Sequence, residues 1–215
     1  MEKNEKAMIK LMTIFSLLLF SMQVNAQNFE GEVVYSNLFT SKIQNFTDEQ
    51  LGTMIGTKQE YFIKDGNYKS FLNGQSVTMQ LYDYKTNRLY TKTPKTDTLY
   101  WFDASINTDE VTSFEIKKNA EKILGNECDA IIMKTKTGTT TIFYTTQFKV
   151  DGKAYVNHNY SNWAFFTSKT GALPLKTIVE TNQFKMVSTA TEIKPMKLGE
   201  EYFNIDAKTP TKKSS

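Results

Sequence analysis

The sequence predicts a mainly β protein with a single curved sheet of sequential antiparallel strands and little helix. Short segments rich in β-branched and aromatic residues alternate apolar and polar positions, as half-buried strands do. Turn signals such as Asp65-Gly66 and Asn73-Gly74 recur roughly every 8 to 14 residues, which is the spacing of strands that follow one another in a sheet. Few segments repeat apolar residues with the period of a helix.

Residues 1–26 have the pattern of a signal peptide. Three lysines precede an apolar run at 11–22, and the sequence VNA at 24–26 supplies the small residues of a cleavage site. The apolar run is about a dozen residues long, whereas a helix that spans a membrane needs about 20. We therefore expect cleavage, no membrane span afterwards, and a periplasmic location, with release from the cell as the alternative.

The charge of the chain is nearly balanced, with 26 basic and 23 acidic residues. Because the basic residues are scattered rather than clustered, the sequence does not favour nucleic acid as a partner. The part that follows the signal peptide has the length of one domain, which we place at 27–206. Residues 207–215 (AKTPTKKSS) contain no apolar run, so we expect a disordered tail.

The first strand and one clear helix open this domain. Residues 29–38 (FEGEVVYSNL) alternate apolar and polar side chains and predict a half-buried strand. Thr47 and Gln50 then have the spacing of a capping box, in which each side chain accepts a hydrogen bond from the backbone of the other. Gly56 is a typical helix stop. We expect two turns of amphipathic helix between Thr47 and Gly56.

From residue 58 onward the chain predicts strands and turns, with two interruptions. The segment 114–146 is a run of strands joined by tight turns that contain glycine. Residues 103–110 are polar and predict a loop. Residues 151–171 are longer and rich in aromatic side chains, so this insertion must pack onto the body of the protein or cover an opening.

Residues suited to catalysis are scarce. His158 is the only histidine, and we expect it to be a loop residue with local hydrogen bonds. Cys128 lies between Glu127 and Asp129, which would raise the pKa of the thiol, so we expect a buried, unreactive side chain. The spacing of zinc ligands, a phosphate-binding loop and a nucleophile elbow are all missing from the sequence. We predict no catalytic residues, no metal and no cofactor.

The aromatic content is high, at 13% of all residues. The run 99–102 (LYWF) places aromatic side chains on both faces of one strand, so that either both faces are covered or one lines a cavity. A thick aromatic core explains the run without a ligand. The functional interpretation is a hollow face that binds an apolar ligand under the helix and the insertion. The candidate ligand-binding residues are Met79, Leu81, Trp101, Phe114, Ile132, Trp163 and Phe166.

Several segments resemble a known family. They are FEGEVVYS, ILGNECDAIIMKT, GTTTIFYTTQF, ALPLKTIVE and EYFNID, spread over most of 29–206. These segments resemble secreted proteins of Gram-negative envelopes that are grouped with the lipoprotein-carrier fold of LolA, LppX and RseB. The resemblance implies an open half-barrel with one or two short helices on its concave face, which in relatives holds acyl chains or recognises a lipoprotein. It brings no catalytic residues, and a fold alone does not fix a function.

The leading hypothesis is a non-enzymatic periplasmic protein that binds a lipid or a lipoprotein acyl chain. Burial of such a chain gains about 0.8 kcal/mol per methylene and needs no polar motif. The alternative is an envelope protein–protein interaction module with a solid core, which presents Trp163, Phe165 and Phe166 to a partner. An enzyme with a cleft near His158 is the third interpretation.

Overall fold

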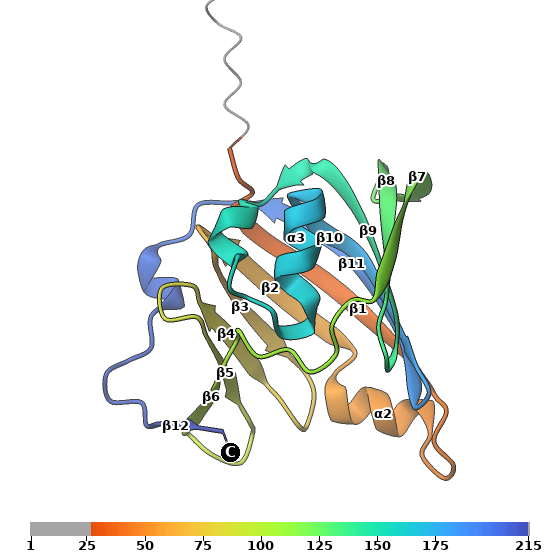
Figure 1. Ribbon diagram of the computed structural model, residues 1–215. Helices are drawn as coiled ribbons and strands as arrows, with labels where there is room; N and C mark the ends of the chain where they lie inside the picture. Colours follow the sequence, from red (N-terminus) through yellow and green to blue (C-terminus); the bar gives the residue numbers. More distant parts are fainter. Residues whose placement is uncertain (1–26, 215) are drawn as a thin grey trace, which may run out of the picture.

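One open sheet of twelve strands forms most of the protein (Figure 1). The structure is a computed structural model that describes residues 27–214, so the predicted signal peptide lies outside the described residues. The strands follow the order β12-β6-β5-β4-β3-β2-β1-β11-β10-β9-β8-β7. Neighbours are antiparallel except β12 and β6, which are parallel. The predicted fold class is confirmed. The strands are β1 Gly31–Ser41, β2 Lys58–Lys64, β3 Asn67–Leu72, β4 Met79–Asp83, β5 Arg88–Lys92, β6 Leu99–Asp103, β7 Ser113–Ile123, β8 Asn126–Lys134, β9 Gly138–Lys149, β10 Ala172–Thr181, β11 Phe184–Pro195 and β12 Thr211–Lys213.

Helix α2 (Asp48–Ile55) begins and ends where the sequence predicts. The Thr47 hydroxyl accepts a hydrogen bond from the Gln50 amide (3.1 Å), and the Gln50 side chain accepts one from the Thr47 amide (2.8 Å). Both amides would otherwise lack a partner in the helix. Gly56 ends the helix with a φ of 111°, which glycine adopts readily. Its carbonyl accepts a hydrogen bond from Asn37 Nδ2 (3.1 Å), which ties the helix end to β1.

The insertion at 151–171 covers one face of the sheet, which we call the inner face, and Figure 1 shows its helix α3 in front of the strands. The insertion contains η1 (Gly152–Tyr155), η2 (Tyr160–Asn162) and α3 (Trp163–Thr170). The sequence predicts no helix here, because aromatic residues and threonines are modest helix formers. Packing decides the outcome instead: Phe166 is fully buried, and Gly171 ends α3 in the left-handed conformation.

Aromatic rings of the insertion fill the inner face over β3 and β4. His158 lies 4.1 Å from the ring of Tyr82 and 5.7 Å from that of Tyr68, measured between centroids. Tyr155 packs edge-on against Trp163 at 5.8 Å. Aromatic pairs at these distances add stability beyond the area they bury. The insertion therefore fills the concave face of the sheet over β3 and β4.

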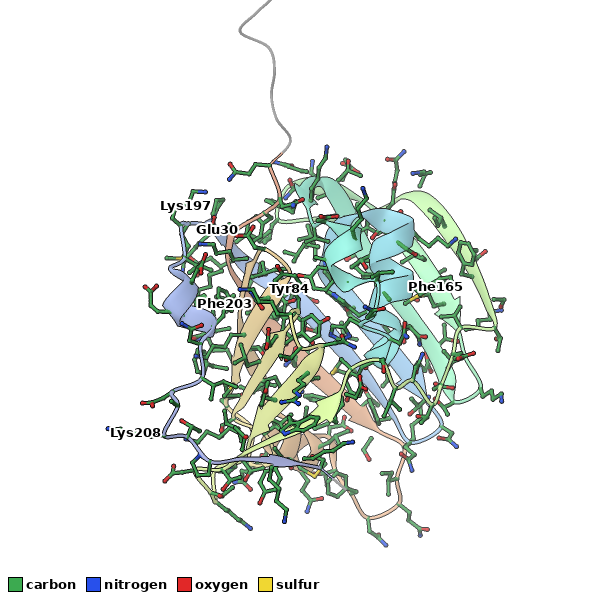
Figure 2. The ribbon with its side chains drawn as sticks, turned by 60° about the vertical axis from the view of Figure 1, so that its left-hand side comes forward. Glu30, Tyr84, Phe165, Lys197, Phe203 and Lys208 are labelled. Carbon is green, nitrogen blue, oxygen red and sulfur yellow. The ribbon has the colours of Figure 1, made fainter. Side chains whose placement is uncertain are left out.

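The outer face of β4–β6 is covered by the C-terminal segment, residues 196–214. Leu198 and Phe203 are buried there in one cluster with side chains of β4, β5 and β6. Figure 2 shows Glu30 and Lys197 beside each other where the segment leaves β11, and their charged atoms are 3.0 Å apart. Glu30 also accepts a hydrogen bond from the Leu198 amide (2.5 Å). No helix within residues 27–214 is long and apolar enough to span a membrane.

Residues 207–214 differ from the disordered tail that we expected. They contain β12, which adds to the edge of the sheet alongside β6. The Leu99 amide donates to the Pro210 carbonyl (2.9 Å), and the Ser214 amide donates to the Trp101 carbonyl (2.8 Å). Backbone hydrogen bonds to an open strand edge hold this segment. They depend little on side-chain type, which is why the polar composition gave no indication of them.

Candidate functional site

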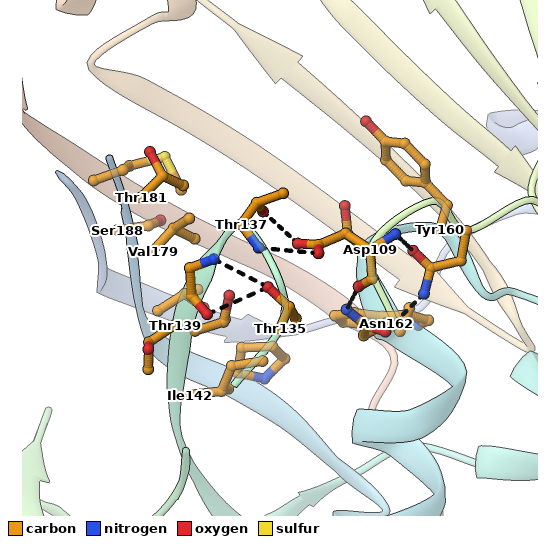
Figure 3. A pocket seen from close by; sticks show the side chains of 18 of the residues that line it. Asp109, Thr135, Thr137, Thr139, Ile142, Tyr160, Asn162, Val179, Thr181 and Ser188 are labelled. Atoms are coloured by element: carbon orange, nitrogen blue, oxygen red, sulfur yellow. Dashed lines mark hydrogen bonds between the residues drawn. The ribbon is translucent and has the colours of Figure 1, made fainter. Parts of the chain in front are cut away.

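A cavity of about 800 Å³ lies on the inner face beside the insertion. Strands β1, β2, β9, β10 and β11 supply its floor, and the insertion supplies Tyr160, Asn162 and Trp163 to one wall. The loop at 104–111, which we call the strap, contributes residues 106–109 to the lining. Figure 3 shows the cavity with the strap near the turn between β8 and β9.

Small side chains explain why the floor is hollow. Ser188 of β11 pairs with Thr177 of β10, and Thr177 pairs with Ile142 of β9. In the next row Val179 pairs with Thr140. All five line the cavity. The same face carries tyrosines on β2, β3 and β4, so the cavity opens where tyrosine gives way to serine and threonine and the insertion no longer reaches across.

The strap is fastened on two sides of the cavity (Figure 3). Asn107 Nδ2 donates to Asn162 Oδ1 (2.7 Å), and Asn162 Nδ2 donates to the Asp109 carbonyl (3.0 Å). Asn162 has a φ of 59°, a conformation that asparagine tolerates better than most residues. On the other side the Asp109 carboxylate accepts hydrogen bonds from the amides of Lys136 (3.1 Å) and Thr137 (3.2 Å) and from the Thr137 hydroxyl. The strap thus links the insertion to the β8–β9 turn.

Two carboxylates, Asp109 and Glu180, belong to the cavity lining. Burial alone would raise the pKa of Asp109, but hydrogen bonds from threonine hydroxyls and backbone amides of the β8–β9 turn outweigh it and lower that pKa. The pKa of Glu180 is lowered as well, chiefly by its hydrogen bond from Lys42 (3.0 Å). Both groups are therefore ionised at neutral pH. Within residues 27–214, Asp109 forms no ion pair.

His158 is not the locally bonded loop residue that we expected. Its side chain is 1% exposed, and its Nε2 is 2.8 Å from the hydroxyl of Tyr68, which is 90 positions away in the chain. Among residues 27–214, its Nδ1 has no hydrogen-bond partner. Burial lowers the pKa of His158 to about 4, because a charged imidazole loses its hydration among the surrounding rings. A neutral histidine with this environment serves the packing of the insertion.

The pKa of His158 predicts how stability depends on pH. The folded protein keeps the ring neutral down to about pH 4, whereas in the unfolded chain it gains a proton near pH 6.5. The free energy of unfolding should therefore fall as the pH drops from 6.5 to 4, by up to about 3 kcal/mol. Urea titrations across this range should show that fall in the wild type and a much flatter profile in His158→Gln. Identical slopes for the two proteins would contradict the assignment.

Four of the seven candidate residues lie on the outer face, and the structure corrects their placement on the hollow face. Met79 and Leu81 are buried beneath the C-terminal segment, and Trp101 packs against the same cluster. Ile132 alternates with two β8 residues whose side chains belong to the inner cluster under α3, so it faces outward. The alternation of side chains along a strand separates its two faces but does not show which of them is concave. Over β4–β6, moreover, the C-terminal segment covers the outer face as well.

The other three candidates lie on the inner face. Trp163 lines the cavity. Phe166 is fully buried in the cluster beneath α3, 6.1 Å from the ring of Tyr144. Phe114, on the edge strand β7, is 45% exposed and meets Phe165 of α3 at 5.2 Å. Of the seven, Trp163 alone lines the cavity, and the contact of any of them with a ligand stays a prediction.

Most of the lining was missed by the sequence analysis. The sequence feature that could have revealed the lining is threonine and serine at alternate positions of neighbouring strands. Such short side chains leave part of the concave face unfilled. The predicted polar loop at 103–110 overlaps the strap, but its place over the cavity follows only from the structure. The lining residues that were not predicted from the sequence include Tyr35, Tyr61, Phe102, Asp109, Thr140, Ile142, Tyr160, Asn162, Thr177, Val179, Met186 and Ser188.

Groups that could support metal or thiol chemistry are not assembled in the described part of the chain. Among residues 27–214, no three His, Cys, Asp or Glu side chains are grouped so that they could hold a metal ion. Cys128 is fully buried, and burial raises the pKa of its thiol, with further increases from neighbouring carboxylates that include Glu127 and Asp129. The prediction of a small buried cysteine is confirmed.

Comparison with known proteins finds similar structures but no similar curated sequence. No family model and no curated protein matches the chain. A LolA superfamily protein from Nitrosomonas europaea is 10% identical, with a TM-score of 0.40 over 83% of this chain and 91% of that one. The lipoprotein LppX from Mycobacterium tuberculosis is 11% identical, with a TM-score of 0.36 over 79% and 89%. LprF from Mycobacterium bovis is 10% identical, with a TM-score of 0.33 over 81% and 89%.

The likeness to LolA and LppX that the sequence segments suggested is therefore confirmed as a structural similarity. With TM-scores of 0.40 or less, it supports no conclusion about function.

Proposed function

We propose that this protein is a non-enzymatic, exported carrier that holds the apolar part of a lipid, such as a lipoprotein acyl chain, in the cavity beneath the strap. The observation that carries the proposal is the cavity itself. Its volume of about 800 Å³ falls within the roughly 300–1,000 Å³ of pockets that bind drug-sized ligands. Its floor belongs to a continuous sheet, so the binding surface is largely formed before a ligand arrives.

The lining supports an apolar chain. Tyr35, Ile142, Val179 and Met186 come from four neighbouring strands and present rings or aliphatic groups to the same space. Ten buried methylenes would gain about 8 kcal/mol before the entropic cost of association. Such a gain needs no charged partner and no catalytic group. A chain with few chemically active residues could therefore still bind an apolar ligand tightly.

Export follows from the sequence of residues 1–26 and fits a carrier between membranes. The predicted cleavage would release residues 27–215 into the periplasm, where a lipid cannot cross water unaided. A cavity that a strap holds partly closed would shield the chain during transfer. The proposal requires no metal, no cofactor and no nucleic acid.

An envelope protein as partner is the second candidate function, and one observation favours it. Ile106 of the strap is 58% exposed and Tyr160 of the insertion is 40% exposed, and both also line the cavity. A protein that delivers or receives a lipid would meet these side chains first. By contrast, the patch that the sequence suggested is weakened, because Phe166 is fully buried.

Extraction of the purified protein tests the proposed function. Protein isolated under native conditions should release a lipid into organic solvent, detected by mass spectrometry in an amount close to one molecule per chain. After extraction and refolding, it should take up a fluorescent acyl-chain probe that the same lipid displaces. A clean extract together with no uptake of the probe would refute lipid carriage.

A further inference from the structure

The charged residues that line the cavity are all acidic. Its lining residues include Asp109 and Glu180 but no lysine, arginine or histidine. Glu180 is balanced by Lys42, whose Nζ is 3.0 Å away. Asp109 instead receives neutral donors, the hydroxyl of Thr137 and the amides of Lys136 and Thr137. Its negative charge therefore stays uncompensated at the strap, on the wall of the cavity.

The floor offers neutral hydrogen-bonding groups beneath this charge. Thr140, Thr177 and Ser188 lie on three adjacent strands and all line the cavity. Within residues 27–214, the hydroxyls of these three side chains form no hydrogen bond with another protein group. Each hydroxyl can both donate and accept. They can satisfy ester, carbonyl or hydroxyl oxygens of a ligand, which would otherwise lose their hydration at a cost.

We infer that the ligand carries an uncharged, oxygen-rich head group, such as a glycerol ester, and that the protein discriminates against lipids with an anionic head group. This inference rests on the proposed function and specifies its ligand. A carboxylate or phosphate brought beneath the strap would meet Asp109 with no cationic side chain in the lining to offset the repulsion. Like charges in a partly buried site repel far more strongly than in bulk water. A neutral head group would not be repelled by Asp109 and could form hydrogen bonds with the hydroxyls of the floor.

Three amphiphiles with the same chain test the inference: monolauroylglycerol, laurate and dodecyltrimethylammonium. Their dissociation constants are measured by displacement of a neutral fluorescent probe at pH 8, below micelle formation. Monolauroylglycerol should bind about tenfold more tightly than laurate, and the difference should shrink in high salt. Asp109→Asn keeps an acceptor for the β8–β9 turn but removes the charge, so it should bring laurate to within about threefold of the ester.

Glu127→Gln provides the matched control, because Glu127 is exposed on β8 and is not part of the lining. It removes the same charge and should leave the preference unchanged. If laurate bound as tightly as monolauroylglycerol, the inference would be overturned but lipid carriage would stand. The same holds if dodecyltrimethylammonium bound tenfold more tightly than monolauroylglycerol. Failure of all three amphiphiles to bind would remove the proposed function and the inference with it.

Discussion

Replacement of Thr140 by tryptophan should abolish most of the affinity for an acyl chain without unfolding the protein. Thr140 lines the cavity from β9 and is only partly buried, so an indole there grows into empty space rather than into packed core. If it displaces about three methylenes of the ligand, at about 0.8 kcal/mol each, the affinity should fall about 50-fold. Titration of the variant with a fluorescent acyl-chain probe measures the loss.

Thr141→Trp is the matched control for this experiment. Thr141 is the next residue of the same strand and pairs with Ile132 and Ile178, so its side chain points to the outer face. This variant should bind the probe like the wild type. Equal losses of affinity in the two variants would mean that the ligand is not held on the inner face. If both variants kept the affinity of the wild type for the probe, the cavity beside Thr140 would not be the binding site.

Phe166→Ala should cost about 3–5 kcal/mol of the free energy of unfolding, as expected for removal of a buried phenyl ring. Phe166 is fully buried and joins α3 to the sheet through the ring of Tyr144. It also packs against Trp163, 5.6 Å away, so its loss loosens the wall of the cavity. Urea or guanidinium unfolding curves measure the change.

Phe165→Ala serves as the comparison, because this neighbour on α3 is only partly buried. It contacts the exposed Phe114 at the rim of the sheet, where solvent already reaches the rings. The expected loss is about 1 kcal/mol, typical of a substitution outside the core. A larger loss from Phe165→Ala than from Phe166→Ala would contradict the packing described for the insertion.

The parts of the fold that sequence predicts well are those set by local chemistry. The capping box of Thr47 and Gln50 satisfies amides within four residues of each other, so the pattern is visible before any tertiary contact forms. The alternation along 29–38 likewise appears as alternating burial in β1. Helix α3 is different. Its residues WAFFTSKT have no strong helical preference, and the helix is stabilised by the rings that it buries.

The site was harder to predict because it depends on which face of each strand is concave. Met79 and Leu81 have the pattern of residues that line a pocket, yet the C-terminal segment covers them from the other side. Their contacts with Leu198 and Phe203 bridge more than a hundred positions in the chain. On β9–β11 the floor of the cavity carries small polar residues such as Thr140, Thr177 and Ser188. The cavity is hollow there because these side chains are too short to fill the concave face of the sheet.

The central claim is that a lipid chain occupies the space between β9–β11 and the strap, and nuclear magnetic resonance mapping tests it most directly. Amide resonances of ¹⁵N-labelled protein would be followed while monolauroylglycerol is added. The largest shifts should fall on residues at the cavity, such as Thr140, Thr177 and Ser188. The resonances of Met79, Leu81 and Trp101 should stay nearly unchanged. Shifts concentrated on the outer face, with the β9–β11 resonances unmoved, would contradict it.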